Sequence, residues 1–555
     1  MLTALLALAY GGFIYLLLPA EVTTLGDDFG YYRSIIETLQ HHRPWTDAWL
    51  EPWAASLSVM AAAIFRVSGS FHLATYGLQS VLAALAFGCL CHLLRRRGHA
   101  WPVAALLAGL FLTAPTVLWK QLEFTGIVLY WPCLLTALMA AEGRRWGWFT
   151  VAWVLALWTR QSALAWGVIP AWEILQAWRR GSAGADWRRP LWAGVAGVAA
   201  FGLASVLMNK THAQALITDH VFEQLDPWRM ARYAATGLLV YAVAAGVGAC
   251  GLAFGPGPLR TGRGWLALLA GLAVVASFAA LRWDPRLLVA VEQACYEGQP
   301  GRYLFPALLV AAIVGWLSVR VAFQPRMLVY AAASLALVSL RKDHLWDYYL
   351  GDVLIIALLS VGASTAQPTP AAPGKAMRGF LRAAVAALLL GFIAFNGWAV
   401  LQLKLRLDRA HATNHLCEQA LRRGELQPHQ LYGASFGFVA WHLYPYYIAH
   451  EGRTERKIAG FWNYLVYSID IRTVYHGWPG RISPFKDEYP PEAAKLIQQG
   501  NYPVWRFFTA DFHLQRCTPL PVTPPYVMMK ADEYRYVPFP LDDREWRELL
   551  AQTRL

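Results

Sequence analysis

Two adjacent carboxylates, Asp27 and Asp28, stand between an apolar N-terminal segment and a polar run. Like charges side by side repel, and partial burial at a membrane surface raises the cost of ionising both. A chain keeps such a pair when it needs a general base, a metal ligand or a cap for the next helix. Asp is a favoured N-cap residue and residues 31–40 have a helical pattern, so these residues alone leave all three roles open.

The segment before the pair predicts where it lies. Residues 1–20 are apolar and just long enough to cross a bilayer, and they lack the basic start and clear cleavage site of a signal peptide. We therefore expect an uncleaved first membrane helix, with Asp27 and Asp28 beyond its outer end in an outer loop, residues 21–70. The same loop contains Glu51 and a short apolar run that predicts a helix lying in the membrane interface.

Composition predicts an all-α polytopic membrane protein. Of the 555 residues, 57% are hydrophobic and only 15% are charged, and long apolar runs recur along the chain. In a membrane protein the net charge of +13 usually reports cytoplasmic loops and anionic lipid, so we expect no nucleic-acid partner. The sequence contains no Walker loop and no zinc-type spacing of Cys and His.

The apolar runs predict about thirteen transmembrane helices of roughly 20 residues each. They are residues 1–20, 71–94, 101–118, 127–141, 146–158, 163–178, 190–208, 233–254, 264–281, 303–323, 327–340, 345–361 and 380–401. A cytoplasmic N-terminus puts the Arg clusters, such as Arg95 to Arg97, on the cytoplasmic side, as the positive-inside bias requires. We expect a transmembrane domain in residues 1–402 and an extracytoplasmic soluble domain in residues 403–555, where charges, Pro, Tyr and His become frequent.

Several charges break the positive-inside rule, because this topology places them on the outer side. Any single one is best explained as a side chain snorkelling from a helix end. Together they surround the face that carries the acidic pair, and Arg offers bidentate donors to the oxygens of a lipid-linked phosphate. The candidates for contact with such a substrate are Lys120, Glu123, Arg160, Gln161, Arg302, Tyr303 and Arg341.

The order of these motifs resembles the GT-C superfamily of membrane glycosyltransferases, which use sugars linked to polyprenyl phosphate. The family's outer loop carries an acidic pair followed by a Tyr, matched here by Asp27-Asp28 with Tyr31. A short interfacial element around a proline follows, matched by Glu51-Pro52-Trp53. Glu123 resembles a second acidic position in the next outer loop, and Arg302-Tyr303 resembles the Arg-Tyr that opens a late span.

One segment is similar to a narrower group within that superfamily. Arg160-Gln161-Ser162-Ala163-Leu164-Ala165-Trp166 resembles the Arg-Gln-Thr-Asn-Ile-x-Trp segment of dolichyl-phosphate-glucose α-1,2-glucosyltransferases. Ser162 and Ala163 depart from that pattern, and with them the assignment to glucose loses support.

The resemblance implies an inverting glycosyltransferase that moves a sugar from a polyprenyl-phosphate carrier to a hydroxyl of a glycan, lipid or protein acceptor. Asp27 would be the base, and Asp28 and Glu123 would orient the acceptor or hold a divalent cation, Mg or Mn. We expect a multi-pass protein of a bacterial inner membrane whose active site faces the periplasm. The sequence does not indicate the sugar, the acceptor or a metal requirement.

Two other functions stay open. A transporter or flippase of lipid-linked saccharides would need ionisable residues deep within its spans, and the apolar runs contain almost none. An inactive scaffold whose C-terminal domain binds partners is the third possibility, and the intact acidic pair argues against it only weakly.

Overall fold

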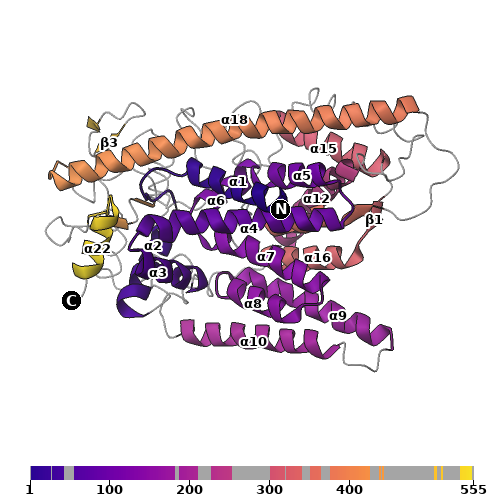
Figure 1. Cartoon of the computed structure of the whole chain (residues 1–555), viewed down its shortest axis with the longest axis horizontal. Coiled ribbons are helices and arrows are strands. Elements are labelled where there is room, and N and C mark those ends of the chain that lie inside the picture. Colours follow the sequence, from indigo (N-terminus) through magenta and orange to yellow (C-terminus); the bar gives the residue numbers. More distant parts are fainter. Residues whose placement is uncertain are drawn as a thin grey trace. The chain divides into compact units, whose positions relative to one another are not determined.

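The computed structural model describes residues 2–26, 28–42, 55–181, 187–209, 227–252, 301–318, 321–339, 350–363, 375–425, 437–438, 441–442, 506–508, 514–516 and 538–552. This part of the chain is mostly helical (Figure 1). Its sheets are two short antiparallel ribbons, which the sequence analysis did not predict: β1 (Val321–Phe323) with β2 (Val361–Ala363), and β3 (Arg506–Phe508) with β4 (Leu514–Arg516).

The helices follow the predicted apolar runs closely. In the N-terminal half they are α1 (Leu2–Leu17), α2 (Asp28–His41), α3 (Ala55–Ser68), the π-helical turn η1 (Leu73–Gly77), α4 (Leu78–Arg96), α5 (Trp101–Leu112), α6 (Pro115–Leu122), α7 (Gly126–Glu142), α8 (Trp146–Leu157), the 3₁₀ helix η2 (Gln161–Gly167), α9 (Val168–Arg179) and α10 (Arg188–Asn209). Further along they are α12 (Pro227–Leu252), α15 (Gly301–Ser318), α16 (Pro325–Ser339), α17 (Gly351–Leu359), α18 (Lys375–Arg422) and α22 (Asp543–Gln552).

Four helical segments among the described residues are long and apolar enough to cross a membrane. They are Leu73–Arg96, Arg188–Leu207, Tyr233–Leu252 and Val385–Arg422. These helices confirm the predicted helical fold in this coarse form and are compatible with a membrane protein. The count of thirteen spans and the extracytoplasmic domain stay predictions, and the predicted span 264–281 lies outside the described residues.

One predicted span is wrong as a single helix. Residues 101–118 were expected to be continuous, but α5 ends at Leu112 and a new helix begins at Pro115. Proline has no N–H for the helical ladder, and it disfavours helical backbone at the residue before it. The break was therefore readable from the sequence, and the short helix that follows it, α6, ends at Leu122, just before Glu123.

The chain divides into two compact units. The first comprises residues 1–14, 79–122 and 126–401, and the second comprises residues 15–78, 123–125 and 402–555. The predicted domain boundary at 402–403 falls inside α18, which is one continuous helix (Figure 1). No Pro or Gly lies in residues 398–422, and Lys404 pairs with Asp408 one turn later at 2.7 Å, so the change in composition does not end the helix.

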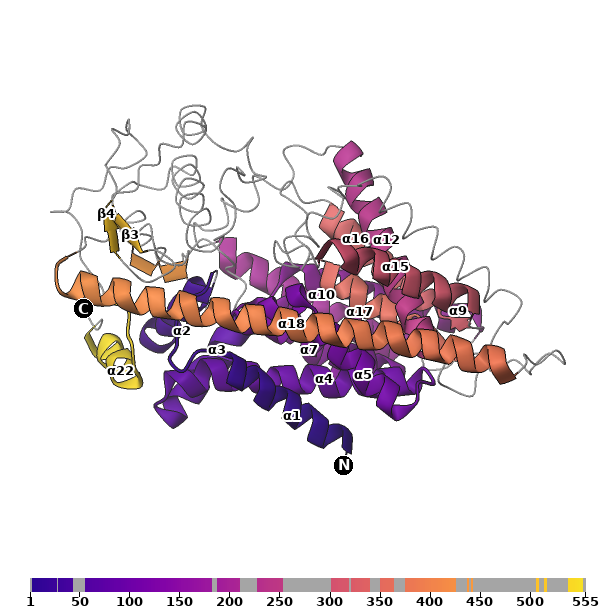
Figure 2. The same cartoon turned by 90° about the horizontal axis from the view of Figure 1, so that it is seen from above.

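In the first unit, α12 packs along α15 and α17 (Figure 2). The Cys250 thiol on α12 donates to the Ala311 carbonyl on α15 at 2.7 Å, so the two helices approach closely there. On another side of the unit, α8 packs against α7 and α10. These contacts are mostly apolar, as expected for helices that share a membrane-embedded core.

Charged side chains meet where α4 and α7 end and α16 begins. Arg97 donates to the Glu142 carboxylate, and Arg326 reaches the same oxygen at 3.4 Å. Burial lowers the pKa of Arg97, while the charge of Glu142 opposes that shift. The neighbouring ribbon β1–β2 is tied to this corner, because the Ala363 N–H donates to the Arg97 carbonyl at 2.8 Å. Loops that were predicted to share the cytoplasmic side therefore share one end of this unit.

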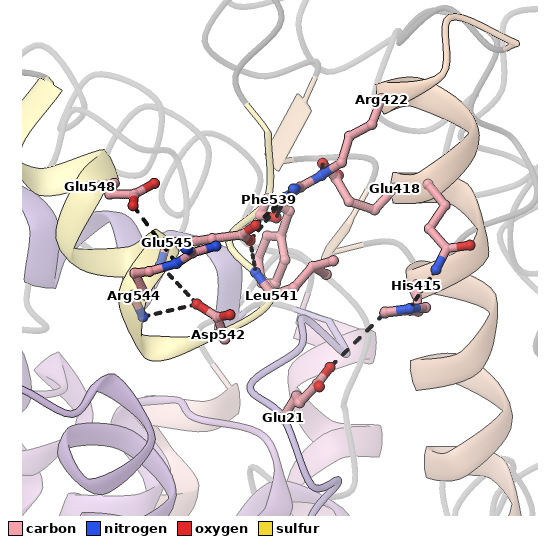
Figure 3. Close-up of polar contacts among 11 residues, drawn as sticks. Glu21, His415, Glu418, Arg422, Phe539, Leu541, Asp542, Arg544, Glu545 and Glu548 are labelled. Atoms are coloured by element: carbon pink, nitrogen blue, oxygen red, sulfur yellow. Dashed lines mark hydrogen bonds and ion pairs between the residues drawn. The ribbon is translucent and has the colours of Figure 1, made fainter.

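In the second unit, Arg422 at the end of α18 binds both α22 and the segment that precedes α22 (Figure 3). Its guanidinium donates to both oxygens of Glu545 at 2.8 and 3.0 Å, to Glu418 at 2.9 Å and to the Phe539 carbonyl at 3.1 Å. The hydrogen bond from Arg422 is the main reason that the pKa of Glu545 lies below its usual value. Bidentate pairs of this kind are the ones that contribute measurable stability.

We predict that Glu545→Gln lowers the stability of the folded protein by about 1 kcal/mol, because the pair is only partly buried. Since the pKa of Glu545 is lowered on folding, its contribution is fully present above the unfolded-state pKa of Glu and is lost as the pH falls through the folded-state pKa. Thermal unfolding in detergent between pH 7 and pH 3 measures both effects. The matched control is Glu425→Gln, which removes the exposed pair with Arg423; equal losses for the two variants would contradict the prediction.

Candidate functional site

The loop between α1 and α2 is buried in the second unit although it has no regular secondary structure. Residues 22–25 are less than a tenth exposed, so their backbone groups need partners inside the protein. The Thr23 N–H donates to the Tyr76 hydroxyl at 3.1 Å, and the Tyr32 hydroxyl donates to the Thr23 carbonyl at 3.3 Å. From α18, the Asn414 amide donates to Thr23 Oγ1 and to the Thr24 carbonyl, both at 2.9 Å.

Asp28 is the first residue of α2 and is completely buried. Its carboxylate accepts from the Leu25 N–H at 2.9 and 3.0 Å and from the Gly26 N–H at 3.1 Å. These bonds point back along the chain, so Asp28 closes the turn that carries Asp27. Asp27 itself lies outside the described residues. Asp28 therefore has a structural role, whether or not it also acts in catalysis as predicted.

Glu123 lies against this same turn. It is 2% exposed, and a Cβ on Gly26 would overlap its Oε1 atom. On the other side, a Cβ on Gly437 would meet the Gly26 carbonyl, and it would lie 3.1 Å from Asp28 Oδ1. Position 437 therefore requires glycine, because a backbone atom is in the way, whereas a side chain at Gly26 would force the Glu123 carboxylate to move. The sequence predicted that Glu123 and the acidic pair act together, and the fold brings Glu123 and Asp28 to one turn.

The pKa of Tyr32 indicates the electrostatic field at this turn. Burial raises its pKa well above the usual value, and the charges of Asp28 and Glu123 raise it further. Its ring stacks on that of Phe124 at 5.7 Å, next to Glu123 in sequence. Tyr32 therefore stays protonated and donates its hydrogen bond at every physiological pH. The surrounding field favours a proton or a cation, which suits a general base or a metal ligand.

The described residues contain no group of three His, Cys, Asp or Glu side chains that could hold a metal ion. A Mg or Mn site at this turn would therefore need a ligand from outside them, and Asp27 is the adjacent carboxylate in sequence. The expected divalent cation stays a prediction.

A second polar cluster lies in the first unit, around Arg160. This residue precedes η2, is 8% exposed, and holds its guanidinium 5.7 Å from the centre of the Tyr130 ring. The Tyr130 hydroxyl on α7 donates to Asp352 in the first turn of α17, and it accepts from the Trp166 indole N–H at 3.1 Å. Gln161, next to Arg160, is exposed at the surface of this unit.

The sequence analysis missed Asp352 and Tyr130. Asp352 lies within the predicted span 345–361, which was regarded as apolar, and Tyr130 lies within the span 127–141. A signal was present, because carboxylates in an apolar run, here Asp347 and Asp352, are costly and usually mark a functional site. Tyr130 lies 222 residues before Asp352, so this pair could not have been identified without the fold.

The remaining predicted site residues fall into two groups. Tyr31 on α2 and Lys120 on α6 are buried, at 3% and 9% exposed. Outside the described part lie Glu51 and Arg341, and also the side chains of the residues that begin α15, Arg302 and Tyr303. Their predicted roles stay predictions.

Comparisons with protein-family models and with curated proteins found no match to this chain.

We predict that Asn414→Asp destabilises the second unit more than Asn414→Ala. The alanine variant loses two hydrogen bonds and leaves acceptors unpaired, for about 1–3 kcal/mol. The aspartate variant adds a buried charge, which can accept from the Thr23 hydroxyl but which repels the Thr24 carbonyl, an acceptor that loses its donor. Unfolding midpoints in detergent compare the two variants. An aspartate variant as stable as the alanine variant would contradict this ranking, and an alanine variant as stable as the wild type would show that these bonds do not hold the loop.

Proposed function

We propose that this protein is a membrane glycosyltransferase of the GT-C type, which moves a sugar from a polyprenyl-phosphate carrier to a hydroxyl acceptor. The single observation that carries the proposal is the placement of Glu123 against the turn of Gly26 and Asp28. The family resemblance requires these two acidic positions to act at one site, although almost 100 residues separate them. Nothing in the local sequence forces them together.

In the proposed reaction, Asp27 takes the proton of the acceptor hydroxyl while that oxygen attacks the anomeric carbon. The new C–O bond forms as the bond between the anomeric carbon and the phosphate oxygen breaks, so the configuration inverts. The phosphate leaves on its polyprenyl carrier with the electron pair of that bond. Asp28 holds the turn through the Leu25 and Gly26 N–H groups, and Glu123 orients the acceptor or the base.

The donor's phosphate would bind to basic residues on the outer side, among them Lys120, Arg160, Arg302 and Arg341. Tyr31, Glu51, Gln161 and Tyr303 complete the expected set of substrate contacts. The polyprenyl chain stays in the lipid, which the apolar surfaces of helices such as α10 contact. The acceptor is a glycan, a lipid or a protein.

The proposed topology has thirteen spans, a cytoplasmic N-terminus and an extracytoplasmic domain in residues 403–555. The meeting of Arg97, Glu142 and Arg326 supports the sidedness, because all three come from loops assigned to the cytoplasm. The same assignment puts Arg160 and the start of α7 on the outer side, where the donor would bind. A bacterial inner membrane with the site facing the periplasm fits this arrangement.

A transporter or flippase of lipid-linked saccharides is the second candidate, and Asp352 is the observation that favours it. This carboxylate is 6% exposed within an apolar run, as expected of a residue on a substrate or proton path. Reconstituted protein separates the two candidates. A glycosyltransferase forms a new glycosidic bond from a radiolabelled polyprenyl-phosphate sugar, whereas a flippase only moves the intact lipid between leaflets.

We predict that Asp27→Asn lowers the rate of sugar transfer about 10²- to 10⁴-fold, or roughly 3 to 5 kcal/mol of barrier, because Asn keeps the shape of the side chain and loses the proton acceptor. The assay uses purified protein with a panel of radiolabelled polyprenyl-phosphate sugars. The exposed Asp408→Asn is the matched control and should transfer at the wild-type rate. A correctly folded Asp27→Asn protein that is fully active would show that Asp27 is not the base.

Reporter fusions test the topology independently. A reporter fused after Gly98 should report the cytoplasm, and one fused after Gly424 should report the opposite compartment, because the positions of the Arg clusters set this orientation. The measurement is the activity of alkaline phosphatase and of green fluorescent protein at each site. The same sidedness at both positions would contradict the proposed map.

A further inference from the structure

The Arg160 cluster contains a carboxylate and a hydroxyl to which no role has yet been assigned. Tyr130 and Asp352 come from α7 and α17, and both are nearly inaccessible, at 2% and 6% exposed. The two helices are in close contact here, because a Cβ on Gly351 would overlap the Trp131 ring. The cluster is therefore built into the packing of the first unit, and its geometry does not depend on mobile side chains.

The hydroxyl of Tyr130 connects the members of the cluster. It donates its one proton to Asp352 and accepts from Trp166, so both neighbours fix the orientation of the ring. Arg160 lies over that ring, and Asp352 attracts the guanidinium electrostatically. A cation over an aromatic ring in a site this dry is held more firmly than one in water.

We propose that Asp352 and Tyr130 are positioning residues that hold the Arg160 guanidinium as a ligand of the donor's phosphate, an inference that rests on the function proposed above. The N–H donors of a guanidinium lie in one plane and form a fork that can bind two phosphate oxygens. Gln161 is exposed beside it, so the turn reaches the surface of the unit where a lipid headgroup can approach.

Two variants distinguish the positioning of Arg160 from simple stabilisation of the helix packing. Tyr130→Phe keeps the ring and removes the hydroxyl, and Asp352→Asn keeps the shape and removes the charge. Matched controls lie in the same unit. Tyr10→Phe removes a buried hydroxyl that donates to Gln121, and Glu142→Gln removes the buried carboxylate at the other end of α7, about 18 Å from Tyr130.

The first measurement is binding of farnesyl phosphate to each purified protein in detergent, with farnesol as the uncharged probe. We expect Tyr130→Phe and Asp352→Asn to weaken binding of farnesyl phosphate about tenfold and to leave farnesol unchanged. Arg160→Ala should weaken it further, and Arg160→Lys should restore little because an ammonium lacks the planar fork. Both controls should bind within twofold of the wild type.

Wild-type binding by Asp352→Asn and Tyr130→Phe would overturn the inference. So would an equal loss of binding in Glu142→Gln, since that pattern reports general destabilisation. The transfer assay then separates the two proposals. Protein that transfers sugar but shows an unchanged donor KM in both variants refutes the positioning role alone. Protein that binds farnesyl phosphate through Arg160, yet transfers sugar from no donor, refutes the proposed function and leaves the positioning role in place.

Discussion

The second unit depends on one constraint: a stretch of irregular backbone, residues 22–25, is buried where water cannot satisfy it. Each unpaired buried N–H or carbonyl costs about 1–3 kcal/mol, so the loop is stable only if other elements supply partners. Those partners come from α2, η1 and α18, through Asp28, Tyr32, Tyr76 and Asn414. The arrangement of these three elements is thus specified by the hydrogen-bonding requirement of a few residues.

Aromatic rings complete the enclosure of the loop. Phe71 stacks on Trp546 of α22 at 3.7 Å, and Tyr32 packs edge-on against Phe71 and face-on against Phe124. Rings of this size exclude water and lower the local dielectric, which strengthens the field of Asp28 and Glu123. The residues that stabilise the loop therefore also set the chemistry that is possible beside it, and a catalytic and a structural role for Asp28 do not exclude each other.

In the first unit, the polar and charged side chains of α7 lie near its two ends. On α7, Tyr130 with Asp352 lies near the start, and Glu142 with Arg97 lies at the last residue. The length between them is almost wholly apolar and is buried against α8. Ionisable groups at helix ends and apolar side chains between them are what a bilayer requires, because a charge at its centre is costly. This distribution agrees with the four helices that are long and apolar enough to cross a membrane.

The sequence by itself determined the properties that depend on neighbouring residues: the helical runs, their apolar character, the Arg clusters and the position of the acidic pair. Hydropathy and helical periodicity are local, so runs such as α4 and α10 were readable, and the break at Pro115 could have been. Only the tertiary structure decided that Asn414 satisfies Thr23 across 391 residues, and that Asp352 pairs with Tyr130. Such pairs have no local signature, because many distant side chains could serve as a donor or an acceptor equally well. Helix packing selects which of them come within 3 Å.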